Sequence, residues 1–438
     1  MGVPGRRATQ IMTDLTQIIA PILQTTRLPN LDLGPEAIHP AYGGLSLLNL
    51  PASLARWLGA PDLPHPPLNL HGIDRLADGA QQIVVVLIDA VSFDRFRSWM
   101  SRSGSRLQSL MDGGLFTPLT SVVPSTTTAA LTTLWTGRSP AEHGLLGYEL
   151  FLREYGVVAN MLNQSPMSLD KQPGLLHGAG LVPETMLPVP TLGNHLAAAG
   201  VDAHAFLHHG IRASGLSRTH LAGAQVHGYA TLIDLWTGVR ELVERPDEGR
   251  RLIWAYYGEV DALSHRFGPD SEQAEAEFAA ALESFHQVFL EKLGAERRRE
   301  TFVVLLSDHG QITTRKDAHY ELRSHPSLAR RLHMQPTGEN RLAYLYIRPG
   351  QVEAVAEYVA RTWPEGFRIL PSDHALEAGL FGPGAPAPGA LDRLGDRVAV
   401  SQGNAYLWWA PKENVLIGRH GGVSPDEMLI PFLAARLD

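Results

Sequence analysis

The chain has 438 residues, of which 44% are hydrophobic and 19% are charged, and its formal net charge is -8. This composition is ordinary for a globular protein with one large α/β domain, or with a core domain and a smaller inserted one. The negative charge argues against binding to nucleic-acid duplexes, and the absence of cysteine excludes disulfides and thiolate metal ligands.

The N-terminal region carries no targeting or membrane signal that we recognise. Met1–Thr26 does not have the pattern of a signal peptide, because Pro21 interrupts its short apolar part. No apolar run in the chain reaches the length of a membrane span. We therefore expect a cytoplasmic protein that does not interact with membranes. Residues 1–80 are rich in Pro, Leu and Asn, and they predict an extension packed on the core, with short helices near 13–25 and 51–58.

Three apolar runs predict strands that are buried on both faces, namely Ile83–Ile88, Arg251–Tyr257 and Thr301–Leu306. Stretches with helical periodicity lie between them. Alternating strands and helices predict an α/β fold with a mostly parallel central sheet and helices on both faces. The helices are expected at 93–112, 127–136, 191–199, 229–244 and 271–294.

Residues 340–400 interrupt this alternation and predict a small inserted α+β subdomain that caps the core. Arg341–Ile347 and Phe367–Leu370 predict strands, and Gln351–Thr362 predicts an amphipathic helix. A Gly/Pro-rich stretch, Gly382–Gly389, follows them. The catalytic core would then consist of 81–339 and 401–438.

Each of the three buried runs is followed by an acidic residue: Asp89, Asp261 and Asp308. Ligands of open α/β sheets bind beyond the carboxyl ends of the strands, where the loops converge. A single Asp at such a position is more often the cap of the next helix. Three of them, two accompanied by histidine, are harder to explain as coincidental caps.

The histidines near these acids have spacings that suit metal ligation. Asp261 and His265 are four residues apart, so one helical turn would place both on one face. Asp308 and His309 are adjacent and could face one ion where the chain turns. His420 lies among glycines that let the backbone approach closely. Taken one at a time, each also fits a simpler interpretation, namely a surface pair, a helix cap or an exposed turn.

Hydroxyl residues precede one of the predicted helices in the segment Val123–Leu131. They could simply cap that helix. Alternatively, the free N–H groups and positive dipole end of the helix would hold a phosphate while one threonine attacks it. The local sequence leaves both interpretations open.

Taken in order, these segments resemble the type I phosphodiesterase/nucleotide pyrophosphatase branch of the alkaline-phosphatase superfamily. The resemblance spans about residues 81–432. The matching pieces are the strand end at Asp89, the helix start Pro124-Ser125-Thr126-Thr127 with its tail from Thr136 to Gly144, Asp261…His265…Gly268-Pro269, Ser307-Asp308-His309-Gly310 and His420-Gly421.

The resemblance implies a two-metal site with a threonine nucleophile. Thr127 would attack the phosphorus, in contact with both metals, and form a covalent phospho-threonine. One divalent ion would be bound by Asp261, His265 and His420, and the other by Asp89, Asp308 and His309. Both ions would be zinc, or alternatively manganese. His143 would have a structural role in the loop after the helix.

The chain departs from the family at Tyr148, where nucleotide pyrophosphatases usually carry an asparagine that helps to hold a phosphoryl oxygen. The segment His420–Met428 is also similar to that of phosphomutases of the superfamily. A phosphomonoesterase, a phosphomutase-like enzyme and a non-catalytic binding domain remain alternatives. A sulfatase is excluded, because the Cys/Ser-x-Pro-x-Arg motif is missing.

We expect a small-molecule phosphate ester as substrate, and diesters in preference to monoesters. Monoesters carry about one more negative charge, and enzymes that favour them tend to add a cation near the phosphate. Arg138 is expected at the far end of its helix, and Arg153 is the remaining candidate for such a cation. Aromatic residues close to the motifs could contact the second organic group of a diester, namely Tyr148, Phe151, Tyr155, Tyr256 and Tyr257.

Overall fold

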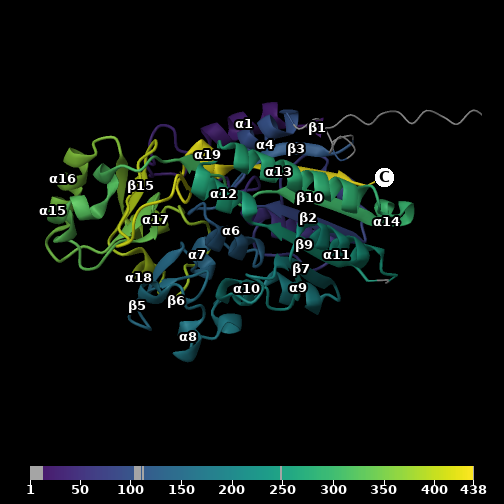
Figure 1. The fold of residues 1–438 in the computed structure, drawn as a ribbon, viewed down its shortest axis with the longest axis horizontal. Coiled ribbons are helices and arrows are strands. Elements are labelled where there is room, and N and C mark those ends of the chain that lie inside the picture. Colours follow the sequence, from purple (N-terminus) through teal and green to yellow (C-terminus); the bar gives the residue numbers. More distant parts are fainter. Residues whose placement is uncertain (1–12, 103–109, 111–112, 247–248, 438) are drawn as a thin grey trace, which may run out of the picture.

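The computed structural model describes residues 13–102, 110, 113–246 and 249–437. Within these residues an eight-stranded sheet forms the centre of the molecule, and a seven-stranded antiparallel sheet forms a separate layer at one end (Figure 1). A third sheet joins two short strands, β11 (Ile312–Thr313) and β16 (Gly418–Arg419). None of the described helices has the length and apolar composition needed to cross a bilayer.

The central sheet is mixed and mostly parallel. Its strands, in spatial order, are β1 (Thr13–Asp14), β3 (Leu115–Thr120), β17 (Leu429–Arg436), β10 (Thr301–Leu306), β2 (Gln82–Ile88), β9 (Arg251–Tyr257), β7 (Asp202–His208) and β8 (Gln225–Tyr229). From β10 to β8 all strands are parallel, whereas β17 runs antiparallel to both of its neighbours. The predicted α/β class is confirmed. Every residue of β2, β9 and β10 is buried, as the continuous apolar runs predicted.

The helices follow the predicted positions closely. Those expected at 127–136, 191–199, 229–244 and 271–294 are α6, α9, α11 and α13, and a π-helix (η4, Phe285–Leu290) continues α13. The helix expected at 93–112 is α4, and most of its predicted second half lies outside the described residues. The α-helices are α1 (Thr16–Thr25), α2 (Leu50–Trp57), α3 (Ile73–Ala77), α4 (Phe93–Arg102), α6 (Thr127–Leu134), α7 (Pro140–His143), α8 (Leu175–Gly178), α9 (Leu192–Ala198), α10 (Gly215–His220), α11 (Leu232–Glu244), α12 (Glu259–Phe267), α13 (Glu272–Ser284), α14 (Ala295–Glu300), α15 (Pro326–Ala329), α16 (Val352–Thr362), α17 (Ser372–Glu377), α18 (Ala390–Leu394) and α19 (Pro425–Met428).

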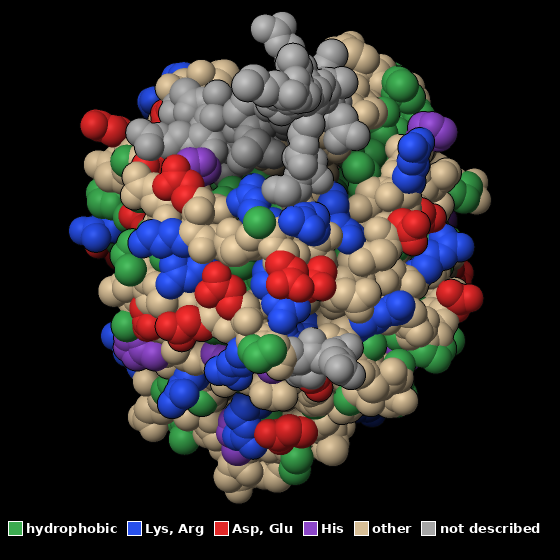
Figure 2. Space-filling model, turned by 90° about the vertical axis from the view of Figure 1, so that its right-hand side faces the viewer, with side chains coloured by type: hydrophobic (Ala, Val, Ile, Leu, Met, Phe, Trp, Pro, Cys, Tyr) green, Lys and Arg blue, Asp and Glu red, His purple; other side chains and the backbone are tan. Residues whose placement is uncertain are grey.

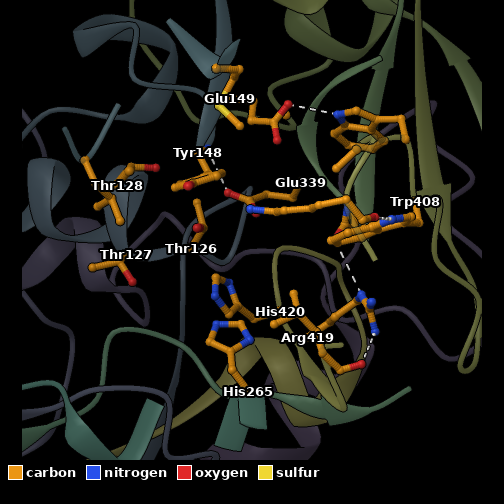
Figure 3. Close-up of a pocket in the computed structure, with 18 of the residues that line it drawn as sticks. Thr126, Thr127, Thr128, Tyr148, Glu149, His265, Glu339, Trp408, Arg419 and His420 are labelled. Carbon is orange, nitrogen blue, oxygen red and sulfur yellow. Dashed lines mark hydrogen bonds between the residues drawn. The ribbon is translucent and has the colours of Figure 1, made fainter. Parts of the chain in front are cut away.

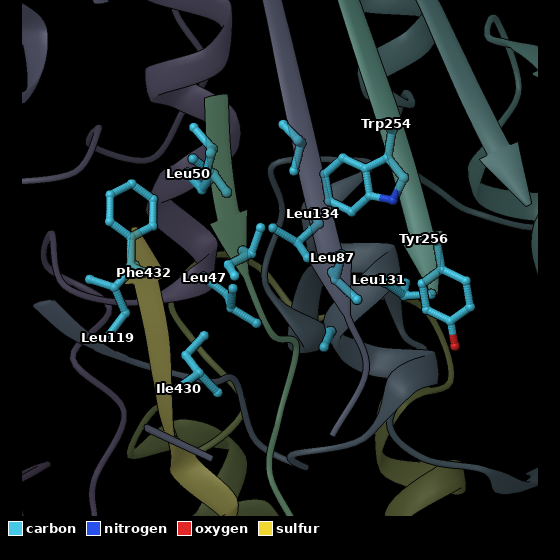
Figure 4. Packing of buried hydrophobic residues seen from close by; sticks show 14 of the residues in the cluster. Leu47, Leu50, Leu87, Leu119, Leu131, Leu134, Trp254, Tyr256, Ile430 and Phe432 are labelled. Atoms are coloured by element: carbon cyan, nitrogen blue, oxygen red, sulfur yellow. The ribbon is translucent and has the colours of Figure 1, made fainter. Parts of the chain in front are cut away.

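Helices cover both faces of the central sheet. On one face, Trp254 of β9 packs against Trp135, the residue after α6, with ring centroids 5.4 Å apart. Figure 4 shows side chains of α2 and α6, such as Leu50 and Leu134, on this same face. On the other face, Phe116 of β3 stacks on Phe93 of α4 at 5.3 Å. Burial on both faces explains why these strands are apolar at every position.

The antiparallel sheet draws on two stretches of chain. Its strands, in spatial order, are β14 (Phe367–Pro371), β15 (Arg397–Ser401), β13 (Leu342–Leu345), β12 (Thr337–Glu339), β4 (Glu149–Leu152), β5 (Val157–Asn160) and β6 (Ser165–Pro166). The strands expected at 341–347 and 367–370 and the helix expected at 351–362 are confirmed as β13, β14 and α16. Three further strands come from residues 149–166, and the limits of an inserted subdomain at 340–400 stay a prediction.

The N-terminal stretch is tied into the core of the molecule. The helices expected near 13–25 and 51–58 are confirmed as α1 and α2. Leu23, Leu47 and Leu54 are completely buried in the main hydrophobic core. The hydroxyl of Tyr42 donates to the carbonyl of Leu380, 3.0 Å away, which links this stretch to the antiparallel-sheet layer.

The carboxyl ends of three neighbouring strands are level. In the sheet register, Leu87 of β2 pairs with Leu306 of β10 on one side and with Tyr256 of β9 on the other. The residues that directly follow these strands therefore lie at one edge. Asp89 and Asp308 are among them, and α12 begins there with Asp261 in its first turn.

Candidate active site and metal centre

Thr127 is the first residue of α6 and lies at the edge where these strands end. Its Oγ1 is 3.2 Å from Nε2 of His309 and 3.5 Å from Oδ2 of Asp89. The turn before it is fixed by Ser125, whose hydroxyl donates to the carbonyl of Gly422 at 2.7 Å. A threonine hydroxyl thus lies at a helix N-terminus, where N–H groups without intrahelical partners and the positive dipole end favour anions.

Asp89, Asp308 and His309 form a completely buried group next to Thr127. Nε2 of His309 is 3.4 Å from Oδ1 of Asp89 and 3.5 Å from Oδ2 of Asp308. Neither of these carboxylate oxygens has a hydrogen-bond partner among the described residues. Buried carboxylate oxygens of this kind are costly unless a cation or a donor satisfies them, so the group fits a metal ion.

Asp261, His265 and His420 form a second, more open group. Oδ1 of Asp261 is 3.5 Å from Nε2 of His265 and 3.9 Å from Nε2 of His420. The first pair lies one turn apart on α12, as the four-residue spacing predicted. The two groups are neighbours, because the ring of His420 stacks on the ring of His309 with centroids 4.1 Å apart.

In all three histidines the Nδ1 atom faces a backbone carbonyl. The partners are the carbonyls of Gly418 for His265 (2.9 Å), Gly310 for His309 (3.1 Å) and Ser125 for His420 (3.2 Å). A proton on Nδ1 that donates to the carbonyl leaves the Nε2 lone pair free, which is the usual arrangement around a metal. The donor set of each group therefore consists of imidazole nitrogen and carboxylate oxygen.

Burial favours the neutral forms of one carboxyl group and one imidazole of the two groups. Burial raises the pKa of Asp89 well above its usual range, and the carboxylates of Asp308 and Asp261 raise it further. Burial also lowers the pKa of His420 well below its usual range, and His309 and His265 add to this effect. The imidazole of His420 is thus neutral, and its Nε2 is available as a ligand.

Glycines allow the backbone to approach this site closely. A Cβ on Gly418 would lie 2.2 Å from Oε1 of Gln311 and 2.3 Å from the carbonyl oxygen of Ser264. Gly421 has φ of +106°, and a Cβ there would come within 2.5 Å of the Cβ of Glu339. Both positions therefore require glycine to keep His265 and His420 together.

Two side chains that orient the carboxylates were not identified from the sequence. The hydroxyl of Tyr256 donates to Oδ2 of Asp89, and Nε2 of Gln311 donates to Oδ1 of Asp261. The sequence suggests Tyr256 as a contact for the organic group of the substrate, but its side chain points to the buried group of Asp89, Asp308 and His309 instead. Its position next to last in a buried strand, level with Leu87 of the neighbouring strand that leads to Asp89, was the only available signal.

A pocket of about 490 Å³ opens in front of Thr127 and extends towards the antiparallel sheet (Figure 3). Of the aromatic residues suggested by sequence proximity, only Tyr148 lines it. Tyr257 donates to Glu277, Phe151 packs against Tyr346, and Tyr155 packs against the hydrophobic core. The sequence did not identify most of the residues that line this pocket, among them Glu149, Glu339, Trp408, Trp409 and Lys412.

The remaining residues considered from the sequence lie as follows. The Tyr148 hydroxyl accepts from Nδ2 of Asn160 at 2.7 Å. Arg138 is 3.4 Å from Glu142, beyond the C-terminal end of α6, and the exposed Arg153 is 3.3 Å from Asp392. Neither arginine lines the pocket. His143 receives a hydrogen bond from the N–H of Leu145 and contacts Thr133, within the loop after α6.

Comparison with known proteins identifies the family and the fold. A model of the family described as type I phosphodiesterase/nucleotide pyrophosphatase matches residues 83–422, more than half of the chain. A search of curated proteins found no match. Among solved structures, murine ectonucleotide pyrophosphatase/phosphodiesterase 5 superposes with a TM-score of 0.61 at 18% identity, covering 81% of this chain and 88% of that one.

Two further structures illustrate the range of similar proteins. An inactive threonine-to-alanine variant of the murine protein, in complex with AMP, gives a TM-score of 0.60 at 17% identity, with coverages of 81% and 88%. Phosphonoacetate hydrolase from Sinorhizobium meliloti 1021, in complex with phosphonoformate, gives 0.58 at 18% identity, with coverages of 81% and 89%. At these identities the likeness establishes the fold, which is that of the alkaline phosphatases.

Proposed function

Because the chain belongs to the type I phosphodiesterase/nucleotide pyrophosphatase family, we propose that it cleaves phosphodiester or pyrophosphate-type bonds with Thr127 as nucleophile. The observation that carries this proposal is the position of the Thr127 hydroxyl. It lies at the start of α6, 3.2 Å from Nε2 of His309, with the two carboxylate–histidine groups beside it. A module that only binds a ligand has no need of a hydroxyl at this point.

The two groups would each hold one divalent metal ion. Asp89, Asp308 and His309 would bind one, and Asp261, His265 and His420 the other, with Thr127 in contact with both. Nitrogen and oxygen ligands of this kind suit zinc, and manganese also accepts them. Bound there, the ions supply the positive charge that lowers the pKa of the attacking hydroxyl and offsets the charge of the phosphoryl oxygens.

The protein groups would carry out the reaction in two displacements. Thr127 Oγ1 loses its proton and forms a bond to phosphorus, while the bond from phosphorus to the leaving alcohol breaks and the alcohol oxygen takes up a proton. Free N–H groups in the first turn of α6 would hold a phosphoryl oxygen. Water then attacks the phospho-threonine, which releases the phosphate product and restores the hydroxyl.

The charge around the pocket supports diesters over monoesters. Among the described residues that line it, the basic ones are Lys412 and Arg419. Arg419 is buried and donates to Asn414 and Thr314, while Lys412 lies 3.7 Å from Asp170. Neither is a free cation for the second negative charge of a monoester. The AMP complex of the murine protein supports a small phosphate ester as ligand.

The test compares bis(p-nitrophenyl) phosphate with p-nitrophenyl phosphate on protein dialysed against a chelator and then reloaded with zinc or manganese. We expect no turnover after chelation, recovery with about two ions per chain, and a higher kcat/KM for the diester. Full activity in excess chelator would contradict the metal site. A clear advantage for the monoester would favour the phosphomonoesterase alternative.

A further inference from the structure

The far side of the pocket is lined by indole rings and a carboxyl group, which the cleavage of a phosphate ester does not require. Trp408 and Trp409 come from the loop between β15 and β16, and both are largely buried where they line the pocket. Figure 3 shows Trp408 across the pocket from Thr127, with Tyr148 and Glu339 between. A substrate whose phosphorus lies at Thr127 would therefore extend an organic group towards these two indoles.

Glu149 lies beside the indoles, at the start of β4. Its carboxylate accepts a hydrogen bond of 2.8 Å from Nε1 of Trp409 (Figure 3). Among the described residues, no arginine or lysine forms an ion pair with it. Lys412 is the basic side chain whose charge lowers the pKa of Glu149. It lies 3.7 Å from Asp170, whose own charge raises that pKa.

A second carboxylate, Glu339, lies nearer to the catalytic threonine. It accepts a 2.8 Å hydrogen bond from the backbone N–H of Tyr148 and also interacts with Thr126. No described arginine or lysine forms an ion pair with it either. Two carboxyl groups without an ion pair to a described basic residue, Glu149 and Glu339, therefore line the pocket.

The charged side chains at other positions around the pocket already have partners. The Arg419 guanidinium lies 4.0 Å from the centroid of Tyr406 and 5.7 Å from that of Trp408, and it donates to Asn414 and Thr314. The exposed carboxylate of Glu413, at the outer rim, pairs with Lys316 at 2.7 Å. Glu149 is thus the acidic group near the indoles whose charge the described part of the chain leaves unbalanced.

Burial of the Glu149 carboxyl group, without an ion pair to a described basic residue, has the expected effect on its titration. It raises the pKa of Glu149 to about 7, although the hydrogen bond from Trp409 acts in the opposite direction. A carboxylate held in this way is costly to ionise, and a cation that enters the pocket would remove that cost.

We propose that Glu149, Trp408 and Trp409 form a subsite for an organic ammonium group, so that the preferred substrates are phosphodiesters of amino alcohols. This inference rests on the proposed phosphodiesterase function and adds the chemical class of the second alcohol. Indole rings attract cations through their π-electron faces, and the carboxylate adds a charge contact in a partly desolvated place. A neutral group of equal size would gain the apolar contacts but would leave Glu149 without its counter-charge.

The test uses two esters that differ by one charge. One is the p-nitrophenyl phosphodiester of choline, and the other is its 3,3-dimethylbutyl isostere, in which carbon replaces the quaternary nitrogen. With metal-loaded protein we expect kcat/KM to be at least about tenfold higher for the choline ester. In Glu149→Gln this ratio should fall towards one, because the amide retains an acceptor for Nε1 of Trp409 but carries no charge, and only the attraction of the indoles remains. Glu413→Gln removes an equal charge at the rim and should keep the wild-type ratio.

Equilibrium binding separates this inference from the proposed function. Calorimetric titration of both esters into the Thr127→Val protein should show tighter binding of the choline ester, lost when Glu149→Gln is added. If neither ester is hydrolysed but this binding difference is found, the proposed function fails and the subsite stands. Equal kcat/KM values for the two esters, or a ratio that Glu149→Gln leaves unchanged, would overturn the subsite while the hydrolysis itself supports the proposed function.

Discussion

Three consecutive threonines, Thr126, Thr127 and Thr128, lie at the start of α6, the first of them directly before it, and their hydroxyl groups have different surroundings. Thr126 is buried and interacts with Glu339, whereas the buried hydroxyl of Thr128 has no hydrogen-bond partner among the described residues. All three residues line the pocket, but it is the Thr127 hydroxyl that faces His309 and Asp89. The local structure therefore distinguishes residues that look equivalent in the sequence.

This difference predicts a sharp contrast between two isosteric substitutions. Thr127→Val should lower kcat by at least about a thousandfold and leave the fold and metal content intact, because an attacking hydroxyl acts in the transition state. Thr127→Ser should retain part of the activity. Thr128→Val, the matched control, removes a buried hydroxyl without a partner and should keep kcat within about threefold of wild type. Steady-state kinetics and metal analysis check both, and a more damaging Thr128→Val would place the nucleophile elsewhere.

At the scale of elements, a buried ion pair joins the antiparallel sheet to the candidate metal centre. Arg341, just before β13, and Glu427 of α19 are fully buried and bonded through two pairs of atoms at 3.1 and 2.8 Å. The Glu427 carboxylate also accepts the N–H of Gly422 at 2.9 Å, and its backbone carbonyl accepts the N–H of Gly310 at 2.9 Å. The segments that carry His420 and His309 are thereby fixed to the same residue.

Removing one partner of this pair should be costly. Arg341→Met leaves Glu427 charged and buried, and we expect the free energy of unfolding to fall by about 3–5 kcal/mol. Metal affinity should fall as well, since the loops of His420 and His309 lose a common anchor. Arg153→Met, which breaks the exposed pair with Asp392, should cost less than about 1 kcal/mol. Chemical denaturation and metal titration of both variants measure this, and equal stability losses would contradict the assigned role.

At the scale of the whole molecule, charge is dispersed and several histidines are buried as neutral groups. Figure 2 shows acidic and basic side chains interspersed on one end of the molecule, where neither sign gathers into a patch. In the interior, burial lowers the pKa of both His143 and His220 to about 3. These two histidines lie outside both carboxylate–histidine groups.

The buried histidines predict a loss of stability in mild acid. The unfolded chain takes up protons on these residues below about pH 6.5, whereas the folded protein resists protonation until about pH 3. Stability should therefore be full above pH 6.5 and decline as the pH falls towards 3. Relative to wild type, His143→Gln should show a shallower decline, by up to about 1.4 kcal/mol per pH unit. Thermal midpoints between pH 4.5 and 8 test this, with the exposed His71→Gln as control; parallel curves for His143→Gln and wild type would contradict it.

The sequence by itself determined the strands that end at the site and the acidic and histidine residues that follow them. Asp89, Asp308 and the Asp261–His265 pair could be located because parallel strands place their carboxyl ends at one edge, whatever else the fold contains. The four-residue spacing on α12 is likewise a local property. The metal-ligating and nucleophilic roles of these residues stay predictions, and their proximity is what the structure shows.

Only the tertiary structure decided which side chains surround the substrate. Glu149 and Trp409 are bonded across 260 positions of sequence, and Tyr256, which looked like a candidate for substrate contact, turns to Asp89. No periodicity encodes such contacts, because they join segments that lie far apart in the sequence. Local propensity fixes each element, whereas the pocket is formed between elements whose relative placement depends on the packing of the whole chain.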